Sequence, residues 1–218
     1  MHKRPVMAFL LGLLILLSGC AMNPPPKADY TAFNQAKPRS ILVVPVVNQS
    51  VEVTAQDYFL STITIPLAER GYYVFPVNMV KRTLEDDGLN DANLVHNAPT
   101  EKLAALFGAD AVLFITITRW DAQYMLLTTQ VTVEMEYVLK SAASGEIIWN
   151  NKKTMIYQPQ NNNSGGHPIG MLIAMAISAA ITKAMPNYIP LATQANNQAI
   201  YNEHNGLPIG PYSKAKTE

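Results

Sequence analysis

The chain contains 218 residues, and its 16 basic side chains are balanced by 16 acidic ones. Charged residues make up only 15% of the sequence and apolar residues 49%, so the chain has enough apolar content to fill a core. Neutral net charge without a basic cluster argues against a protein that binds nucleic acid. The single cysteine, Cys20, excludes an intramolecular disulfide and a cysteine-based metal site.

Residues 1–19 have the pattern of a secretory signal peptide. Lys3 and Arg4 precede an apolar run over residues 6–17, which has the length of a signal sequence and is too short to span a membrane. The sequence LSGC then ends at Cys20. It resembles the lipobox of bacterial lipoproteins, and this resemblance implies cleavage just before Cys20 and attachment of lipid to its sulfur.

The residues after the lipobox bear on localisation. In lipoproteins an aspartate directly after the cysteine commonly marks retention in the inner membrane, so Ala21 implies transport to the outer membrane. Lipid on Cys20 would hold the chain there, with the protein facing the periplasm. Residues 20–39 contain three consecutive prolines and are predicted to be an extended tether. Tyr30 and Phe33 leave open that its second half packs on the following domain.

A buried strand and a divided helix are predicted next. Residues 40–47 (SILVVPVV) form a β-branched run typical of a central strand, and Pro45 should end or deform it. Helical spacing follows over residues 54–70, with Thr54 as the expected N-cap. Pro66 lies inside this pattern and should kink or divide the helix.

The middle of the chain alternates between short helices and strands. The pattern predicts a strand over 72–75, a helix over 78–87 and a polar loop over 90–98. A further helix over 100–107 and an apolar strand over 111–118 follow, the latter expected at the centre of the sheet.

A long β-hairpin is predicted from the clearest alternation in the sequence. Apolar and polar residues alternate over 127–140, as in an antiparallel strand with one face in water. Ser144-Gly145 should form the turn, and residues 146–157 should return as the partner strand. Glu134 and Glu136 share the polar side and are interpreted as part of a solvated face rather than as an acid–base pair.

The predicted order β-α-β-α-α-β-β-β indicates an α/β (α+β) mixed sheet flanked by helices, over residues 40–158. Residues 159–218 are predicted to be a loop, an apolar helix and a polar, Asn-rich segment packed on this domain. The fold prediction therefore includes helices at the C-terminal end.

The apolar helix over residues 168–185 is the predicted partner-binding element. Small side chains recur on one of its faces every four residues: Gly170, Ala174, Ser178 and Thr182. Such spacing lets two helices approach closely. The absence of charge before Lys183 indicates burial nearly all round. Packing on the sheet or on a dimer partner, lying in a membrane interface, and insertion during assembly of a multimer are the three alternatives.

No catalytic or metal-binding pattern is found. His96, His167 and His204 are far apart in sequence and lack the spacing of metal ligands. The chain has no nucleophile-elbow, phosphate-loop or dinucleotide-binding motif. We therefore expect a non-enzymatic protein without a metal or other cofactor.

Two further binding modes are considered. Five aromatic residues could line a site for a small ligand or peptidoglycan, although packing in the core at strand ends is the favoured interpretation: Tyr72, Tyr73, Trp120, Tyr124 and Trp149. The edge of the hairpin could also accept a partner strand by β-augmentation, unless Lys152 and Lys153 blunt it.

Beyond these patterns, the chain resembles a family of outer-membrane lipoproteins of unknown function, known for a genome-derived vaccine-candidate antigen. The resemblance rests on the lipobox and four segments: SILVVPVVN (40–48), PLAERGYYVFP (66–76), GADA (108–111) and GPY (210–212). It implies a fold similar to the N-terminal domain of TolB and to the periplasmic domain of CsgG. It also implies a role in a periplasmic or outer-membrane assembly, and provides no catalytic residues.

These observations lead to one principal hypothesis. The chain is expected to be an outer-membrane-anchored periplasmic lipoprotein that binds proteins, or copies of itself, as an assembly accessory factor in a CsgG-like secretion or transport system. The charged residues of the predicted hairpin fit a soluble sheet better than a lipid-facing pore. A lipoprotein that binds a small ligand or peptidoglycan is the alternative.

Overall fold

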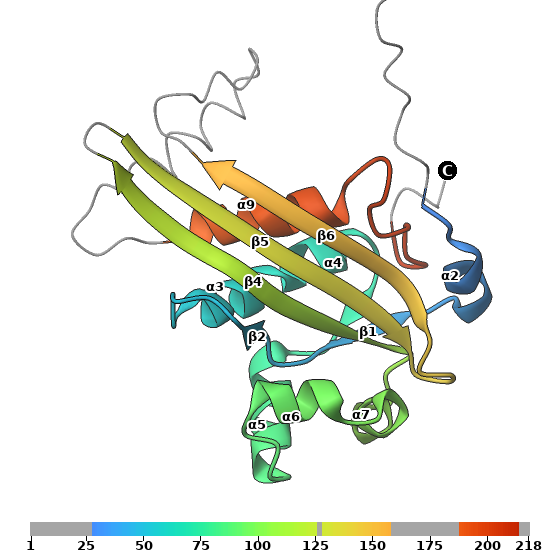
Figure 1. Ribbon diagram of the computed structural model, residues 1–218. Helices are drawn as coiled ribbons and strands as arrows, with labels where there is room; N and C mark the ends of the chain where they lie inside the picture. Colours follow the sequence, from blue (N-terminus) through green and yellow to red (C-terminus); the bar gives the residue numbers. More distant parts are fainter. Residues whose placement is uncertain (1–27, 126–127, 158–187, 214–218) are drawn as a thin grey trace, which may run out of the picture.

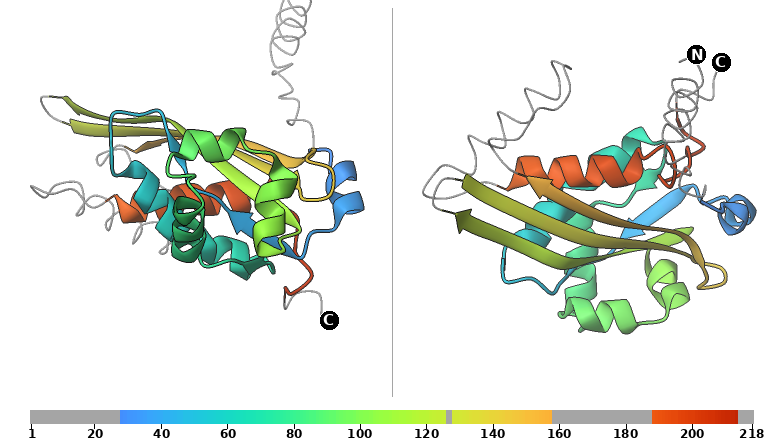
Figure 2. Two further views of the ribbon diagram at one scale, coloured as in Figure 1. Left: turned by 90° about the horizontal axis from the view of Figure 1, so that it is seen from below. Right: turned by 45° about the horizontal axis from the view of Figure 1, so that its top comes forward.

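The computed structural model describes residues 28–125, 128–157 and 188–213 (Figure 1). These residues form one mixed sheet with helices on both of its faces (Figure 2). Within them, no helix has the length and apolar character needed to cross a bilayer. The described ranges leave out the predicted signal peptide, Cys20 and the apolar helix predicted over 168–185.

The sheet combines a parallel part with an antiparallel meander. Its strands are β1 (Ser40–Val43), β2 (Val47–Asn48), β3 (Tyr73–Val74), β4 (Ala111–Met125), β5 (Thr128–Ser141) and β6 (Ile147–Tyr157). Their order is β3-β1-β4-β5-β6, and β2 also pairs with β4. β1 runs parallel to β3 and β4, and β2 is also parallel to β4, whereas β5 is antiparallel to both β4 and β6. The predicted fold class is therefore confirmed.

Pro45 divides the first β-branched run into two strands. β1 ends at Val43, which lies opposite Leu113, and β2 begins at Val47, which lies opposite Thr116. Proline has no N–H to donate to the ladder, so the regular strand stops beside it and resumes after it. The prediction that Pro45 ends or deforms this strand is confirmed.

Helices cover the two faces unequally. One face carries α3 (Ala55–Thr62), α4 (Thr64–Glu69) and α9 (Ile189–Ile200); the other carries α5 (Val77–Asp86), α6 (Ala92–Asn97) and α7 (Thr100–Phe107). Ile41 and Val43 of β1 point into the first layer, while Leu42 and Val44 point into the second. A central strand buried on both faces requires such a continuous apolar run.

Strands β5 and β6 bury only one face. Five alternate side chains of β5 are fully buried beneath α3 and α9: Val131, Val133, Met135, Tyr137 and Leu139. Helices α5 and α6 lie beneath the region of β1, and α7 reaches β5 near the turn of the hairpin, where Val138 packs partly against this layer (Figure 1). The predicted two-faced hairpin is confirmed, with Glu134 and Glu136 on its solvated side.

The helix predicted over 54–70 is divided, as expected. α3 ends at Thr62 and α4 starts at Thr64, so Pro66 lies in the first turn of α4, where its missing N–H has no helical partner. Thr54 precedes α3, but its hydroxyl donates to the Glu52 carboxylate at 2.5 Å and caps nothing. The predicted boundary is right and the predicted capping interaction is wrong.

Two segments predicted to be irregular contain helices. The polar loop expected over 90–98 contains α6, whose first turn is capped by Asp91 accepting from the backbone N–H of Asn93 at 2.7 Å. A short helix, α2 (Thr31–Ala36), lies in the second half of the expected tether and buries Phe33 in the core. The aromatic residues there belong to the packed part of the chain.

Candidate interaction surface

Helix α9 has a buried face and an outward face. Its buried side chains recur with a spacing of four: Leu191, Ala192, Ala195, Asn196, Ala199 and Ile200. This spacing places them on a single side of the helix. The helix contacts α3, α4 and β6, so its other side is turned away from the domain.

A buried polar network holds α9 in place. Asn196 is fully buried, and its Oδ1 accepts a 2.7 Å hydrogen bond from the hydroxyl of Tyr137 on β5. The Nδ2 of Asn196 donates to the Oγ1 of Thr62 on α3 at 2.9 Å. Burial raises the pKa of Tyr137, so its hydroxyl stays protonated and remains a donor. α9 is thus bonded to both the sheet and α3.

A second polar contact fixes the turn after α9. Asn151 of β6 donates to the carbonyl of Ala199 at 2.9 Å, and the Nδ2 of Asn205 donates back to the Oδ1 of Asn151 at 3.2 Å. The indole N–H of Trp149 donates to the carbonyl of Asn205 at 3.0 Å. These bonds attach the end of the helix to the edge strand β6.

The chain then crosses the domain as a strap, residues 206–208. Each of its three carbonyls accepts a hydrogen bond of 2.7 Å from a different side chain. Tyr30 donates to Gly206, Arg70 through its Nε to Leu207, and Tyr72 to Pro208. The strap therefore joins the start of the domain, the end of α4 and the start of β3.

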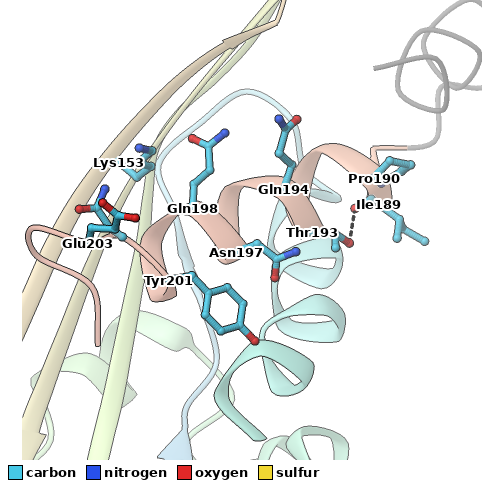
Figure 3. Close-up of a pocket in the computed structure, with 10 residues that line it drawn as sticks. Lys153, Ile189, Pro190, Thr193, Gln194, Asn197, Gln198, Tyr201 and Glu203 are labelled. Carbon is cyan, nitrogen blue, oxygen red and sulfur yellow. Dashed lines mark hydrogen bonds between the residues drawn. The ribbon is translucent and has the colours of Figure 1, made fainter. Parts of the chain in front are cut away.

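The outward face of α9 lines a groove with a volume of about 760 Å³ (Figure 3). Six α9 side chains form its floor: Ile189, Pro190, Thr193, Gln194, Asn197 and Gln198. Lys153 of β6 and residues 201–203 close it at the C-terminal end of the helix, while Ile189 and Pro190 lie at the other end. We call this feature the α9 groove.

The side chains of the α9 groove are better suited to binding a polypeptide than to catalysing a reaction. Gln194, Asn197 and Gln198 offer amide groups that both donate and accept hydrogen bonds, and Ile189 adds exposed apolar surface. In the structurally described ranges, no group of three His, Cys, Asp or Glu side chains is arranged to hold a metal ion.

The site residues predicted from the sequence are not in the described part of the chain. Cys20, the proposed lipid attachment point, lies outside it, as does the helix face formed by Gly170, Ala174, Ser178 and Thr182. Both remain predictions.

The acidic pair on the hairpin forms ion pairs. Lys152 lies 2.7 Å from a carboxylate oxygen of Glu134 and 3.1 Å from one of Glu136. The hydrogen bond from Lys152 lowers the pKa of Glu134, which favours its charged form. His96 is held separately, with its Nε2 3.0 Å from the carbonyl of Pro45, and His204 is exposed in a turn after α9. His167 lies outside the described residues.

The aromatic residues considered for ligand binding do not form one surface. Tyr72, Trp120 and Trp149 are buried in the core, whereas Tyr73 is 54% exposed at the sheet edge. Trp120 packs edge-on against Phe59, with ring centroids 5.5 Å apart. The side chain of Tyr124 lies outside the described part of the structure. The three buried aromatic residues serve core packing.

The sequence pattern does not indicate the groove, because residues 189–200 have the composition of a polar, Asn-rich segment rather than of a helix. Four of its twelve residues are Asn or Gln, which is typical of a loop. Two signals were present: paired small or apolar residues at a spacing of four, and Pro190 in the first turn, where proline is favoured.

Comparisons with known proteins identify the family. The family model described as "Putative lipoprotein GNA1162-like" matches residues 28–212. A curated protein of Neisseria meningitidis serogroup B, "Putative lipoprotein NMB1124/NMB1162", is 35% identical over 209 residues, covering 93% of this chain and 94% of the relative.

Solved structures include a member of the same family. The crystal structure of lipoprotein GNA1162 from Neisseria meningitidis is 35% identical, with a TM-score of 0.56, and the match covers 67% of this chain and all of that chain. The C-terminal domain of LpoB from Escherichia coli is 20% identical, with a TM-score of 0.38, and covers 55% of this chain and 84% of its own. The chain belongs to the GNA1162-like family of lipoproteins.

Proposed function

We propose that this lipoprotein is anchored in the outer membrane by lipid on Cys20, faces the periplasm, and acts without catalysis by binding protein partners. The observation that carries the proposal is the α9 groove, a long, mainly apolar surface with several amide groups, on a helix that internal hydrogen bonds hold rigidly. A rigid element needs little ordering when a partner binds, which lowers the entropic cost of the complex.

The class of partner we propose is a component of a secretion or transport assembly at the outer membrane. The implied likeness to CsgG supports this class. The predicted helix face at Gly170, Ala174, Ser178 and Thr182 is proposed as a second contact, either with such a component or with another copy of the chain.

Site-specific photocrosslinking in cells tests the groove. A photoreactive amino acid replaces Gln198 in the α9 groove, and a matched control places it at the exposed Arg82 on α5, on the opposite face of the sheet. The proposal predicts a discrete adduct from position 198 and none from position 82, with mass spectrometry identifying the captured protein. Equal labelling from both positions, or no adduct from position 198, would contradict it.

Membrane fractionation tests the anchor. Cys20→Ala should move the chain from the membrane fraction to the soluble periplasmic fraction, because no acyl chain can then be attached. Ala21→Asp should keep it acylated but shift it from outer-membrane to inner-membrane fractions. An unchanged distribution of both variants would overturn the proposed anchoring.

A further inference from the structure

A smaller pocket of about 350 Å³ adjoins the α9 groove. Tyr30 and Asn34 near the start of the domain, Arg70 and the strap line it, together with residues 201–203. The same residues 201–203 also close the α9 groove, so the two hollows lie side by side. We call the smaller one the Arg70 pocket.

Arg70 is held in a fixed orientation at this pocket. Its Nε donates to the Leu207 carbonyl at 2.7 Å, and the guanidinium lies over the ring of Tyr201, 5.7 Å from the centroid. A guanidinium has five N–H donors in a planar fork. The described residues place no hydrogen-bond acceptor on the terminal nitrogens of Arg70 and no carboxylate within 4 Å of them.

The charge balance of the two hollows favours an anion at Arg70. Among the lining residues that the structure describes, Lys153 and Arg70 are the cations and Glu203 is the one carboxylate. Nearby Glu69 accepts a 2.8 Å hydrogen bond from the Tyr201 hydroxyl; burial, together with this hydrogen bond, raises the pKa of Tyr201 to about 12. The half-buried guanidinium of Arg70 therefore has no anionic partner among the described residues.

We propose that the Arg70 pocket binds the C-terminal carboxylate of an extended peptide whose preceding residues lie along the α9 groove. The free edge of a guanidinium fits a carboxylate through two parallel hydrogen bonds. The groove amides can pair with the peptide backbone, since they supply both donors and acceptors. This inference rests on the proposed protein-binding function and specifies the part of the partner that is recognised.

The dimensions set the length of peptide. α9 has 12 residues, and at a rise of about 1.5 Å per residue it is about 18 Å long. An extended peptide advances about 3.3 Å per residue, so about five or six residues would follow the helix to the Arg70 pocket.

Fluorescence polarisation with the full lipidated chain in detergent micelles tests the inference. The probe is a hexapeptide of alternating Ser and Ala, labelled at its N-terminus with an uncharged dye and carrying a free C-terminal carboxylate. Its amidated form is the matched control. We expect amidation to weaken binding by about tenfold or more, because it removes a charge-assisted pair. Inorganic phosphate should compete with the probe less effectively than the unlabelled peptide.

Three variants locate the carboxylate. Arg70→Gln should weaken binding about tenfold or more, matching the effect of amidation. Asn34→Asp adds a negative charge at the pocket without removing a strap contact, and should weaken binding by about threefold to tenfold. Glu203→Gln removes a carboxylate that would compete with the peptide for Arg70, and should tighten binding. The remote control Glu146→Gln should leave the affinity unchanged.

If Arg70→Gln unfolds the strap, Asn34→Asp and Glu203→Gln still test the inference, because both leave Arg70 and its contact with the strap in place.

Equal binding of the acid and the amide, or no binding of either, would overturn the inference. Phosphate competing as well as the peptide would also overturn it, because the pocket would then be a general oxoanion site. The peptide-binding inference and the proposed function can fail independently of each other. If the photocrosslink from position 198 persists while the peptide fails to bind, the groove recognises a partner by other means and only the carboxylate inference fails.

Discussion

The hydroxyl of Tyr137 and the side-chain carbonyl of Asn196 form a 2.7 Å hydrogen bond at the buried contact between β5 and α9. Thr62 completes the network from α3. A buried amide without partners is costly, so the network stabilises the one position of α9 in which all three groups are paired. The same position turns the amide side chains of the α9 groove outward.

Tyr137→Phe should lower the free energy of unfolding by about 1–3 kcal/mol, because it leaves the buried Oδ1 of Asn196 without its donor. Urea denaturation of the full chain measures this. The exposed Tyr73 makes no side-chain hydrogen bond among the described residues, so Tyr73→Phe should change stability by less than about 0.5 kcal/mol. Equal effects of the two substitutions would show that the buried network contributes nothing specific.

Gly71 and Gly88 provide a matched test of how residues 210–213 are held on the domain. Both have positive φ, +97° and +85°, so alanine at either position is strained by about 1 kcal/mol. A Cβ on Gly71 would also lie 2.4 Å from the backbone nitrogen of Ser213, whereas one on Gly88 would meet nothing within 4 Å. Gly71→Ala should therefore be more destabilising than Gly88→Ala, by about 1 kcal/mol or more.

The extra effect of Gly71→Ala should be local to the end of the chain. Gly71 accepts from the backbone N–H of Tyr212 at 3.0 Å, and Arg70 accepts from that of Gly210 at 2.8 Å. Displacing this segment exposes it, so limited proteolysis should cleave near residue 210 sooner in Gly71→Ala than in Gly88→Ala. Identical cleavage patterns would show that the segment is not held by this close approach.

Much of the sheet could be predicted from the sequence because its signals are local. The run over 41–47 is apolar at every position, as a strand buried on both faces must be, and Pro45 marks its interruption. The alternation over 127–140 marks a strand with one buried face, and the register of β5 and β6 bears this out. The local pattern of apolar and polar residues is enough to indicate both strands.

The candidate site could not be predicted because its signals are long-range. Asn196 reads as a loop residue until Tyr137 and Thr62, which lie 59 and 134 positions away, are placed beside it. Likewise, nothing near Arg70 in the sequence indicates that its Nε meets the carbonyl of Leu207, 137 residues later. The helix face at 168–185 lies outside the described residues and remains a prediction.

The two tryptophans differ in one hydrogen bond. Trp149 donates its indole N–H to the carbonyl of Asn205, whereas the buried Nε1 of Trp120 finds no acceptor among the described residues. Replacement by Phe removes similar volume from each site, so the cavity terms should be similar. Trp149→Phe should be more destabilising than Trp120→Phe by about 1 kcal/mol, since only the former loses a bond. Urea denaturation measures the free energy of unfolding of both variants. A larger loss in Trp120→Phe would contradict the stabilising role given to the Trp149 hydrogen bond.

His96 should make stability depend on pH. Its ring packs edge-on against Phe114 with centroids 5.2 Å apart, and its Nε2 lies 3.0 Å from the Pro45 carbonyl. Burial lowers the pKa of His96 below its usual 6.5, and the Lys140 charge lowers it further, against an opposing effect of the Pro45 hydrogen bond. The unfolded chain therefore binds a proton at this residue more readily than the folded chain.

The sign of the His96 effect follows from this difference in proton binding. Its contribution to stability is fully present above pH 6.5 and falls as the pH drops through the unfolded pKa toward the lower folded pKa. His96→Gln should therefore lose less stability than the wild type between pH 7 and pH 5, while His204→Gln, at an exposed position, should follow the wild type. Urea denaturation at a series of pH values measures these slopes. A slope unchanged in His96→Gln would mean that other groups carry the pH dependence, because the neutral imidazole packed between Pro45 and Phe114 would then not be coupled to folding.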